Sequence, residues 1–165
     1  RAEFEMPNPR FGEHVPVDEV AGALDVPSEL LRLDGVGPQR VSCGFDQILV
    51  PVSERTVMRG SLRGLDRIQV LLDERGAAGL VLFCPETVDG SADFHCRFLH
   101  PGDRRCEDVA SGTCIAAVAA YAVEHGLGGE ASGDRYGAAL LAALGQAVPH
   151  PGDARQRGRA RLRRP

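Results

Sequence analysis

A short polar turn leads into the most alanine-rich stretch of the chain. Between residues 114 and 123 only Tyr121 is neither small nor aliphatic. Ser111 before this stretch is a favourable N-cap and Gly126 after it is a typical helix end, so the pattern predicts a helix over about residues 113–125. A helix that is apolar on all sides is typical of a core with other elements wrapped around it.

The residues before this helix show the hydrophobic patterns of strands. Residues 41–52 are the best strand candidate of the first half, with an interruption at residues 44–46 that predicts a bulge or a hairpin bend. Residues 79–85 are an apolar run closed by proline, which predicts a buried strand. Residues 92–99 alternate in the period of a strand. One face would carry Phe94, Cys96 and Phe98, and the other Asp93, His95 and Arg97.

Two further segments, residues 17–24 and 65–74, have the patterns of short helices. Several strands therefore precede one buried helix. This order predicts an α+β fold rather than a repeat of βαβ units.

The composition is that of an ordinary soluble domain: 165 residues, 43% hydrophobic and 25% charged. No stretch approaches the roughly 18 apolar residues of a membrane span, and the N-terminus lacks the apolar core of a signal peptide. We therefore expect a cytoplasmic protein with no membrane partner. The five cysteines are irregularly spaced without a C-x-x-C pair, which favours reduced thiols.

Charge is distributed unevenly along the chain. The net charge is −4, and six arginines against Asp153 give residues 152–165 a charge of +5, which leaves −9 for the rest. So acidic a body offers no surface for nucleic acid, and no such partner is expected. Residues 131–165 are atypical throughout, Ala/Leu-rich and then Arg-rich, and are expected to be disordered or weakly helical.

The start of the predicted helix is a candidate anion site. The first N–H groups of a helix have no partner within it, and the hydroxyls of Ser111 and Thr113 flank them here. This arrangement favours a small molecule that bears a carboxylate. An ordinary capped helix with solvent at its start needs the same residue types, so the turn alone leaves both interpretations open.

Two histidines and two cysteines within residues 95–106 prompt a comparison with zinc sites. They are His95, Cys96, His100 and Cys106. Their spacing matches no common zinc module, and strand alternation places His95 and Cys96 on opposite faces. We therefore expect a surface histidine, a core cysteine and no metal site.

The segment between the last predicted strand and the helix carries a recognisable motif. Arg97-Phe98-Leu99-His100-Pro101-Gly102 is followed by Glu107-Asp108-Val109-Ala110-Ser111-Gly112-Thr113. This order resembles the C-terminal half of the PhzF-like phenazine-biosynthesis isomerases, where an Arg-x-Phe-x-Pro segment and a Glu-Asp-x-Ala-Thr-Gly-Ser motif precede a helix. Met6-Pro7-Asn8-Pro9 and residues 41–50 fit further strands of that family. The resemblance covers about residues 4–130, and the Glu-Asp motif is its most specific part.

The resemblance implies a diaminopimelate-epimerase-like fold, in which two pseudo-symmetric domains each wrap a mixed sheet around a central helix. Residues 1–130 would be the C-terminal domain, one half of that fold, and residues 131–165 an added tail. The implied active site lies between the helix N-termini. The implied chemistry is a proton-shuttling isomerisation of a small carboxylate-bearing substrate without any cofactor.

The resemblance also implies roles for particular residues. By position, Asp108 corresponds to a substrate-contacting aspartate and Thr113 to a substrate-binding serine. Gly112 and its neighbours, Ser111 included, would hold the substrate carboxylate.

Two departures from the family bear on activity. The general acid/base of the family is a glutamate of the N-terminal domain, before the matched region, so the resemblance implies an incomplete enzyme that is inactive alone. Glu107 is a candidate replacement, although a carboxylate of the binding motif is poorly suited to that role. Residues 131–165 stand where the family has strands that close its barrel, which a reading-frame change near residue 130 would explain.

Two other functions stay open. One is a non-catalytic or partner-dependent domain, acting as a homodimer or with a complementing N-terminal half, because a lone barrel half leaves an apolar face uncovered. The other is a cysteine-dependent racemase or epimerase of the same fold, with Ala-Cys-Gly-Thr-Gly at the helix start. Here Ser111 stands at the place of the cysteine and Cys114 is expected to face the helix packing, whereas proton abstraction is better served by a thiolate.

Overall fold

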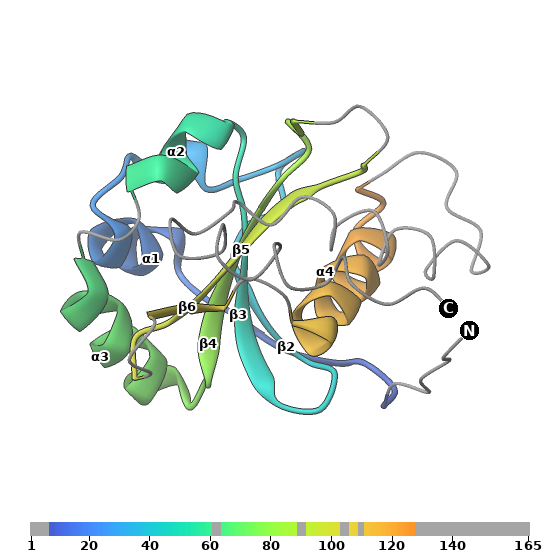
Figure 1. Cartoon of the computed structure of the whole chain (residues 1–165), viewed down its shortest axis with the longest axis horizontal. Helices are drawn as coiled ribbons and strands as arrows, with labels where there is room; N and C mark the ends of the chain where they lie inside the picture. Colours follow the sequence, from blue (N-terminus) through green and yellow to red (C-terminus); the bar gives the residue numbers. More distant parts are fainter. Residues whose placement is uncertain (1–6, 61–63, 89–91, 103–105, 109–110, 128–165) are drawn as a thin grey trace, which may run out of the picture.

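The computed structural model of the chain describes residues 7–60, 64–88, 92–102, 106–108 and 111–127 (Figure 1). The predictions for residues 131–165 lie outside these ranges, as do Met6, Val109 and Ala110 of the motifs above. None of the described helices is long and apolar enough to cross a membrane.

The described strands form one mixed sheet whose spatial order follows the chain. They are β1 (Arg10–His14), β2 (Gln39–Ser42), β3 (Asp46–Pro51), β4 (Gly79–Cys84), β5 (His95–His100) and β6 (Cys106–Asp108). Neighbouring strands are antiparallel except β3 and β4, which are parallel. A parallel pair requires a crossover, which here contains α2 (Arg55–Gly60) and α3 (Leu65–Arg75). The predicted α+β class is confirmed.

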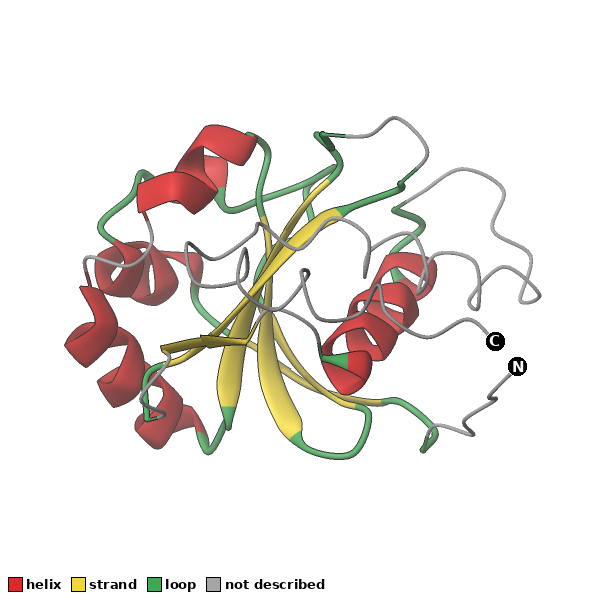
Figure 2. Cartoon of the chain, in the orientation of Figure 1, coloured by secondary structure: helices red, strands yellow, loops and turns green. Residues whose placement is uncertain are grey.

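Helices cover both faces of this sheet. Figure 2 shows α1 (Val17–Leu24), α2 and α3 on one side of the strands and α4 (Gly112–Glu124) on the other. A 3₁₀ turn, η1 (Ser28–Leu30), follows α1. Successive residues of a strand point to opposite faces, so the strands supply two cores. Ile48, Val50, Leu80 and Leu82 belong to the core under α1 and α3, and Leu49, Val81 and Phe83 to the core under α4.

The central helix α4 is anchored at its start and in its middle. Ser111 is the N-cap, and its Oγ accepts the Cys114 N–H at 3.4 Å. Tyr121 is fully buried, packs edge-on against Phe83 with ring centroids 5.4 Å apart, and donates its hydroxyl to the Gly37 carbonyl. The helix predicted over residues 113–125 is confirmed, with both ends shifted by one residue.

The interruption predicted as a bulge or a hairpin bend is a hairpin turn. Strands β2 and β3 pair as far as Ser42 and Asp46, which leaves residues 43–45 as the turn. Gly44 has a φ of 125°, a conformation that residues with a side chain rarely adopt. Glycine therefore lets the chain reverse directly beside the start of α4.

The expectation of a surface position for His95 is wrong, because its side chain is only 2% exposed. It pairs across the sheet with Cys84, which lies in the core under α1 and α3. Successive residues of β5 do point to opposite faces of the sheet. Helices cover both faces, however, so the face that carries His95 and Arg97 is buried as well. Burial and the nearby charges of Arg55 and Arg97 lower the pKa of His95.

Candidate functional site

The N-terminus of α4 is the first part of the candidate site. The Ile115 N–H donates to the Ser111 carbonyl at 3.1 Å, and the Cys114 N–H is taken up by the Ser111 hydroxyl. Within the described part of the chain, no acceptor bonds the N–H groups of Gly112 and Thr113. Two amides at the positive end of the helix dipole are therefore available to an anion.

The surroundings of these amides are open at Gly112 and bounded by the β2–β3 hairpin at Thr113. A Cβ added to Gly112 would meet no atom within 4 Å, whereas one added to Gly44 would lie 3.7 Å from the Thr113 methyl group. The hydroxyls of Ser111 and Thr113 lie 3.0 Å apart. The structure thus brings Ser111, Gly112 and Thr113 together at an accessible helix start.

Strand β6 brings Asp108 to the same end of α4. Asp108 pairs with Phe98 of β5 and so shares with it the sheet face that α4 covers. Its side chain is exposed. Its negative charge is among the influences that raise the pKa of Cys114 in the first turn of α4. Asp108 therefore acts electrostatically at the helix start.

Glu107 points to the opposite face of the sheet. Its two carboxylate oxygens each accept a hydrogen bond from Arg97, from Nε and from Nη2, both at 2.7 Å. Arg97 also donates to the Met58 carbonyl of α2. A carboxylate held on both oxygens by a guanidinium, on the far face from the helix start, is unsuited to take a proton from a ligand there.

Cys114 faces the interior, as the sequence predicts. Its side chain is 3% exposed and belongs to the core under α4. Burial raises the pKa of the thiol to about 12, against smaller opposing effects of hydrogen bonds from Ser111 and Thr113. A thiol that stays protonated near neutral pH is inert as a base or nucleophile.

The histidines and cysteines of β5 and β6 lie on different faces. His95 lies on the same face as Arg97. Cys96 and His100 lie on the other face of β5, and Cys106 of β6 pairs with His100 on that face. Among the described residues no group of three or more His, Cys, Asp or Glu side chains is placed to hold a metal ion.

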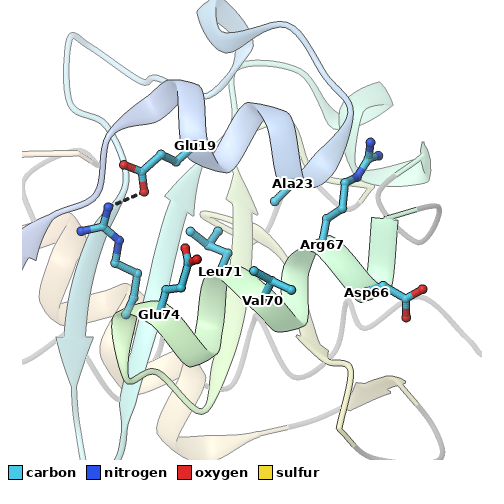
Figure 3. A pocket seen from close by; sticks show the side chains of 8 residues that line it. Glu19, Ala23, Asp66, Arg67, Val70, Leu71 and Glu74 are labelled. Atoms are coloured by element: carbon cyan, nitrogen blue, oxygen red, sulfur yellow. Dashed lines mark hydrogen bonds and ion pairs between the residues drawn. The ribbon is translucent and has the colours of Figure 1, made fainter.

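An open groove of about 480 Å³ lies between α1 and α3. Figure 3 shows Val70 and Leu71 of α3 pointing toward α1. Glu19 and Arg75 form an ion pair at one end of it. The groove is on the opposite side of the sheet from α4, so it is separate from the candidate site.

Gln47 of β3 is not among the residues predicted for the site from the sequence. This side chain is fully buried, and neither of its amide atoms has a hydrogen-bond partner within the described ranges. A signal was present, since Gln47 is the polar residue directly before the apolar run Ile48-Leu49-Val50. A buried polar side chain without a partner is rare and requires an explanation.

The sequence matches no protein-family model and no curated protein significantly. Solved structures that share its fold include the following two. One is a PhzF-family phenazine biosynthesis protein from Bacillus anthracis, at 22% identity and a TM-score of 0.63, with 72% of this chain and 40% of that protein covered. The other is a predicted epimerase from Pseudomonas aeruginosa, at 30% identity and a TM-score of 0.57, with 76% and 42% covered.

The chain thus spans about two fifths of the length of these two structures. Over the part that it spans, the chain has an α+β fold like that of these PhzF-family and predicted epimerase structures, which is the diaminopimelate-epimerase type.

Proposed function

We propose that this chain is the substrate-carboxylate-binding part of a PhzF-like isomerase, and that the isomerisation is a cofactor-independent proton transfer on a small carboxylate-bearing substrate. The observation that carries the proposal is the exposed start of α4, where the amides of Gly112 and Thr113 lack a protein acceptor in the described ranges. The comparison with a PhzF-family protein and a predicted epimerase supports the class of reaction.

Each residue of the site has a distinct task in this proposal. The N–H groups of Gly112 and Thr113 bind the substrate carboxylate, since both point out of the positive helix end. The hydroxyl of Ser111 fixes the first turn of α4 by accepting the Cys114 N–H. Asp108, exposed at the edge of β6, contacts a hydrogen-bond donor of the substrate.

The proton-transferring base is supplied by a second part of the protein. Glu107 is engaged with Arg97 on the other face of the sheet, and Asp108 is a binding group. The two structural neighbours are more than twice as long as the part that this chain matches. We therefore assign residues 1–130 to the C-terminal domain and expect catalysis only when a complementing N-terminal half, or a second copy, faces the start of α4.

Binding of an anion at α4 is tested by NMR titration of the ¹⁵N-labelled chain with propionate, and with propionamide as its uncharged counterpart. We expect the amide signals of Gly112 and Thr113 to shift with propionate and to stay unchanged with propionamide. Equal responses to both compounds, or none to propionate, contradict the anion site.

Catalysis is tested by adding the N-terminal part of the Pseudomonas aeruginosa relative to the chain. Transfer of deuterium from D₂O into candidate amino and cyclic carboxylic acids is followed by proton NMR. Exchange that needs both parts supports the proposal. Exchange by the chain alone refutes the assignment of the base to a second part.

A non-catalytic domain is the second candidate, favoured by the engagement of Glu107 with Arg97. It predicts carboxylate binding without deuterium exchange, both for the chain alone and with the N-terminal part added. A cysteine-dependent epimerase is disfavoured by the buried Cys114, whose pKa is raised to about 12 by burial.

A further inference from the structure

Gln47 is a buried glutamine without a hydrogen-bond partner. Its side chain in β3 is 0% exposed, and both Nε2 and Oε1 lack a partner among the described residues. An unpaired buried amide destabilises the folded state, so the residue requires a role outside the packing of the core.

Gln47 lies on the same face of the sheet as α4 and at the same end as its N-terminus. Leu49, two residues further, packs in the core under α4, and strand alternation gives Gln47 the same face. In the other direction Gln47 is three residues from Gly44, which lies against the Thr113 methyl group. Gln47 therefore lies on the α4 face of the sheet and close in the chain to the hairpin that bounds the candidate site.

The aromatic ring of Phe98 lies over the residue that pairs with Gln47, and the ring of Phe45 lies near that of Phe98. Gln47 is paired with Gly79 of β4, and the Phe98 ring occupies the space over Gly79, since a Cβ there would lie 2.2 Å from it. The Phe45 ring centroid is 6.5 Å from that of Phe98. Phe45 is only partly buried and belongs to the hairpin turn rather than to a strand. Because Gln47 is fully buried, a ligand that reaches its amide has to displace neighbouring side chains.

Gln39 on the neighbouring strand shows how a structural glutamine is satisfied in this sheet. It is 6% exposed. Its Nε2 donates to the Gly12 carbonyl at 3.0 Å, and its Oε1 lies 2.8 Å from Nε2 of His125. Gln47 makes neither kind of contact, so its amide is not explained by the architecture of the sheet.

We propose that Gln47 is a specificity-determining residue that binds a second, uncharged polar group of the ligand whose carboxylate lies on α4. This inference rests on the proposed function. A primary amide presents donors and an acceptor without charge, so it matches a group that both donates and accepts, of which a hydroxyl is the simplest. The helix amides bind the carboxylate, and Gln47 distinguishes carboxylates that carry a hydroxyl from those that do not.

The ligand arm of the test compares lactate with propionate, which differ by one hydroxyl, in NMR titrations of the full chain. The wild type is expected to bind lactate roughly 2- to 10-fold more tightly, the range that one hydrogen bond supplies. In Gln47→Met the preference is expected to fall to about 1 while the propionate affinity is retained. A preference that survives in Gln47→Met overturns the inference and leaves the proposed function standing. Absence of binding for both compounds in the wild type overturns both.

The stability arm needs no ligand and uses Gln39→Met as the matched control. Gln47→Met removes an unpaired amide, so the Tm is expected to rise by roughly 3–8 °C, whereas Gln39→Met removes paired groups and is expected to lower it. Gln47→Leu provides a second apolar variant. A lower Tm, or failure to fold, in both Gln47 variants overturns the inference, because the amide would then be structural.

Discussion

Arg97 and Glu107 form a two-bond ion pair across β5 and β6, on the face of the sheet opposite to α4. Arg97 is 9% exposed and Glu107 18% exposed at their side chains. The pair fixes the short edge strand β6 to the sheet, and the Arg97 bond to the Met58 carbonyl ties both strands to α2. Asp108, the next residue, is thereby held on the α4 face. The Glu-Asp motif thus combines an anchoring carboxylate with an exposed one.

Removal of one partner of this pair is expected to destabilise the fold strongly. Arg97→Met leaves the Glu107 carboxylate partly buried without its counter-ion, which costs about 3–5 kcal/mol. The double variant Arg97→Met/Glu107→Leu leaves no charge behind and should recover most of that loss. Urea denaturation followed by circular dichroism measures both. A double variant as unstable as the single one would show that the ion pair is not the cause.

The sequence predicts the elements of this fold better than it predicts their surroundings. The apolar stretch at residues 114–123 specifies α4 because no polar face competes, and the Ser111 cap fixes its start. The burial of His95 was not predictable, since it depends on helices packing against both faces of the sheet. The partner of Glu107 lies ten residues away on another strand, and only the register of β5 and β6 brings Arg97 to it.

Gln47 illustrates a further limit of the sequence. A glutamine at the start of an apolar strand fits an exposed strand end as well as a buried position. Its surroundings include Gly79 and the Phe98 ring over Gly79, both of which lie far from Gln47 in the chain. Long-range packing therefore determines which polar residues remain without partners.

The stability of the protein is expected to fall between pH 7 and 5.5 through His125. Burial and the charge of His14 lower the pKa of His125, and Glu124 opposes this only in part. The unfolded imidazole, with a pKa near 6.5, takes up its proton at higher pH than the folded one. The contribution of His125 to the free energy of unfolding is therefore complete above about pH 7 and is lost as the pH falls through about 6.5.

The check on this pH dependence is urea denaturation of wild type and His125→Gln across that range. Glutamine retains a partner for the Gln39 amide without a titrating group. His125→Gln should show a shallower fall, with a remainder due to His95, whose pKa burial also lowers. If the free energy of unfolding falls equally with pH in both proteins, His125 is not a source of the pH dependence.

The thiols should differ in reactivity according to burial. Cys114 is 3% exposed with a pKa raised to about 12 by burial, while Cys106 is half-buried. At pH 8, iodoacetamide is expected to modify Cys106 well before Cys114 in the folded chain, as measured by mass spectrometry of peptides. In urea the two should react at similar rates. Early modification of Cys114 in the folded chain would support the hypothesis of a cysteine-dependent epimerase.

Asp108 should weaken anion binding at the start of α4. A negative charge beside the two free helix amides opposes a bound carboxylate, so Asp108→Asn is expected to raise the affinity for propionate by roughly 2- to 5-fold at low ionic strength. Glu124→Gln removes an exposed carboxylate from the other end of the same helix and is the matched control, since helix-dipole effects are confined to the terminal turns. Salt should reduce the difference between Asp108→Asn and wild type because the charge at residue 108 is exposed. An equal gain in both variants would indicate a general charge effect and would remove Asp108 from the binding site.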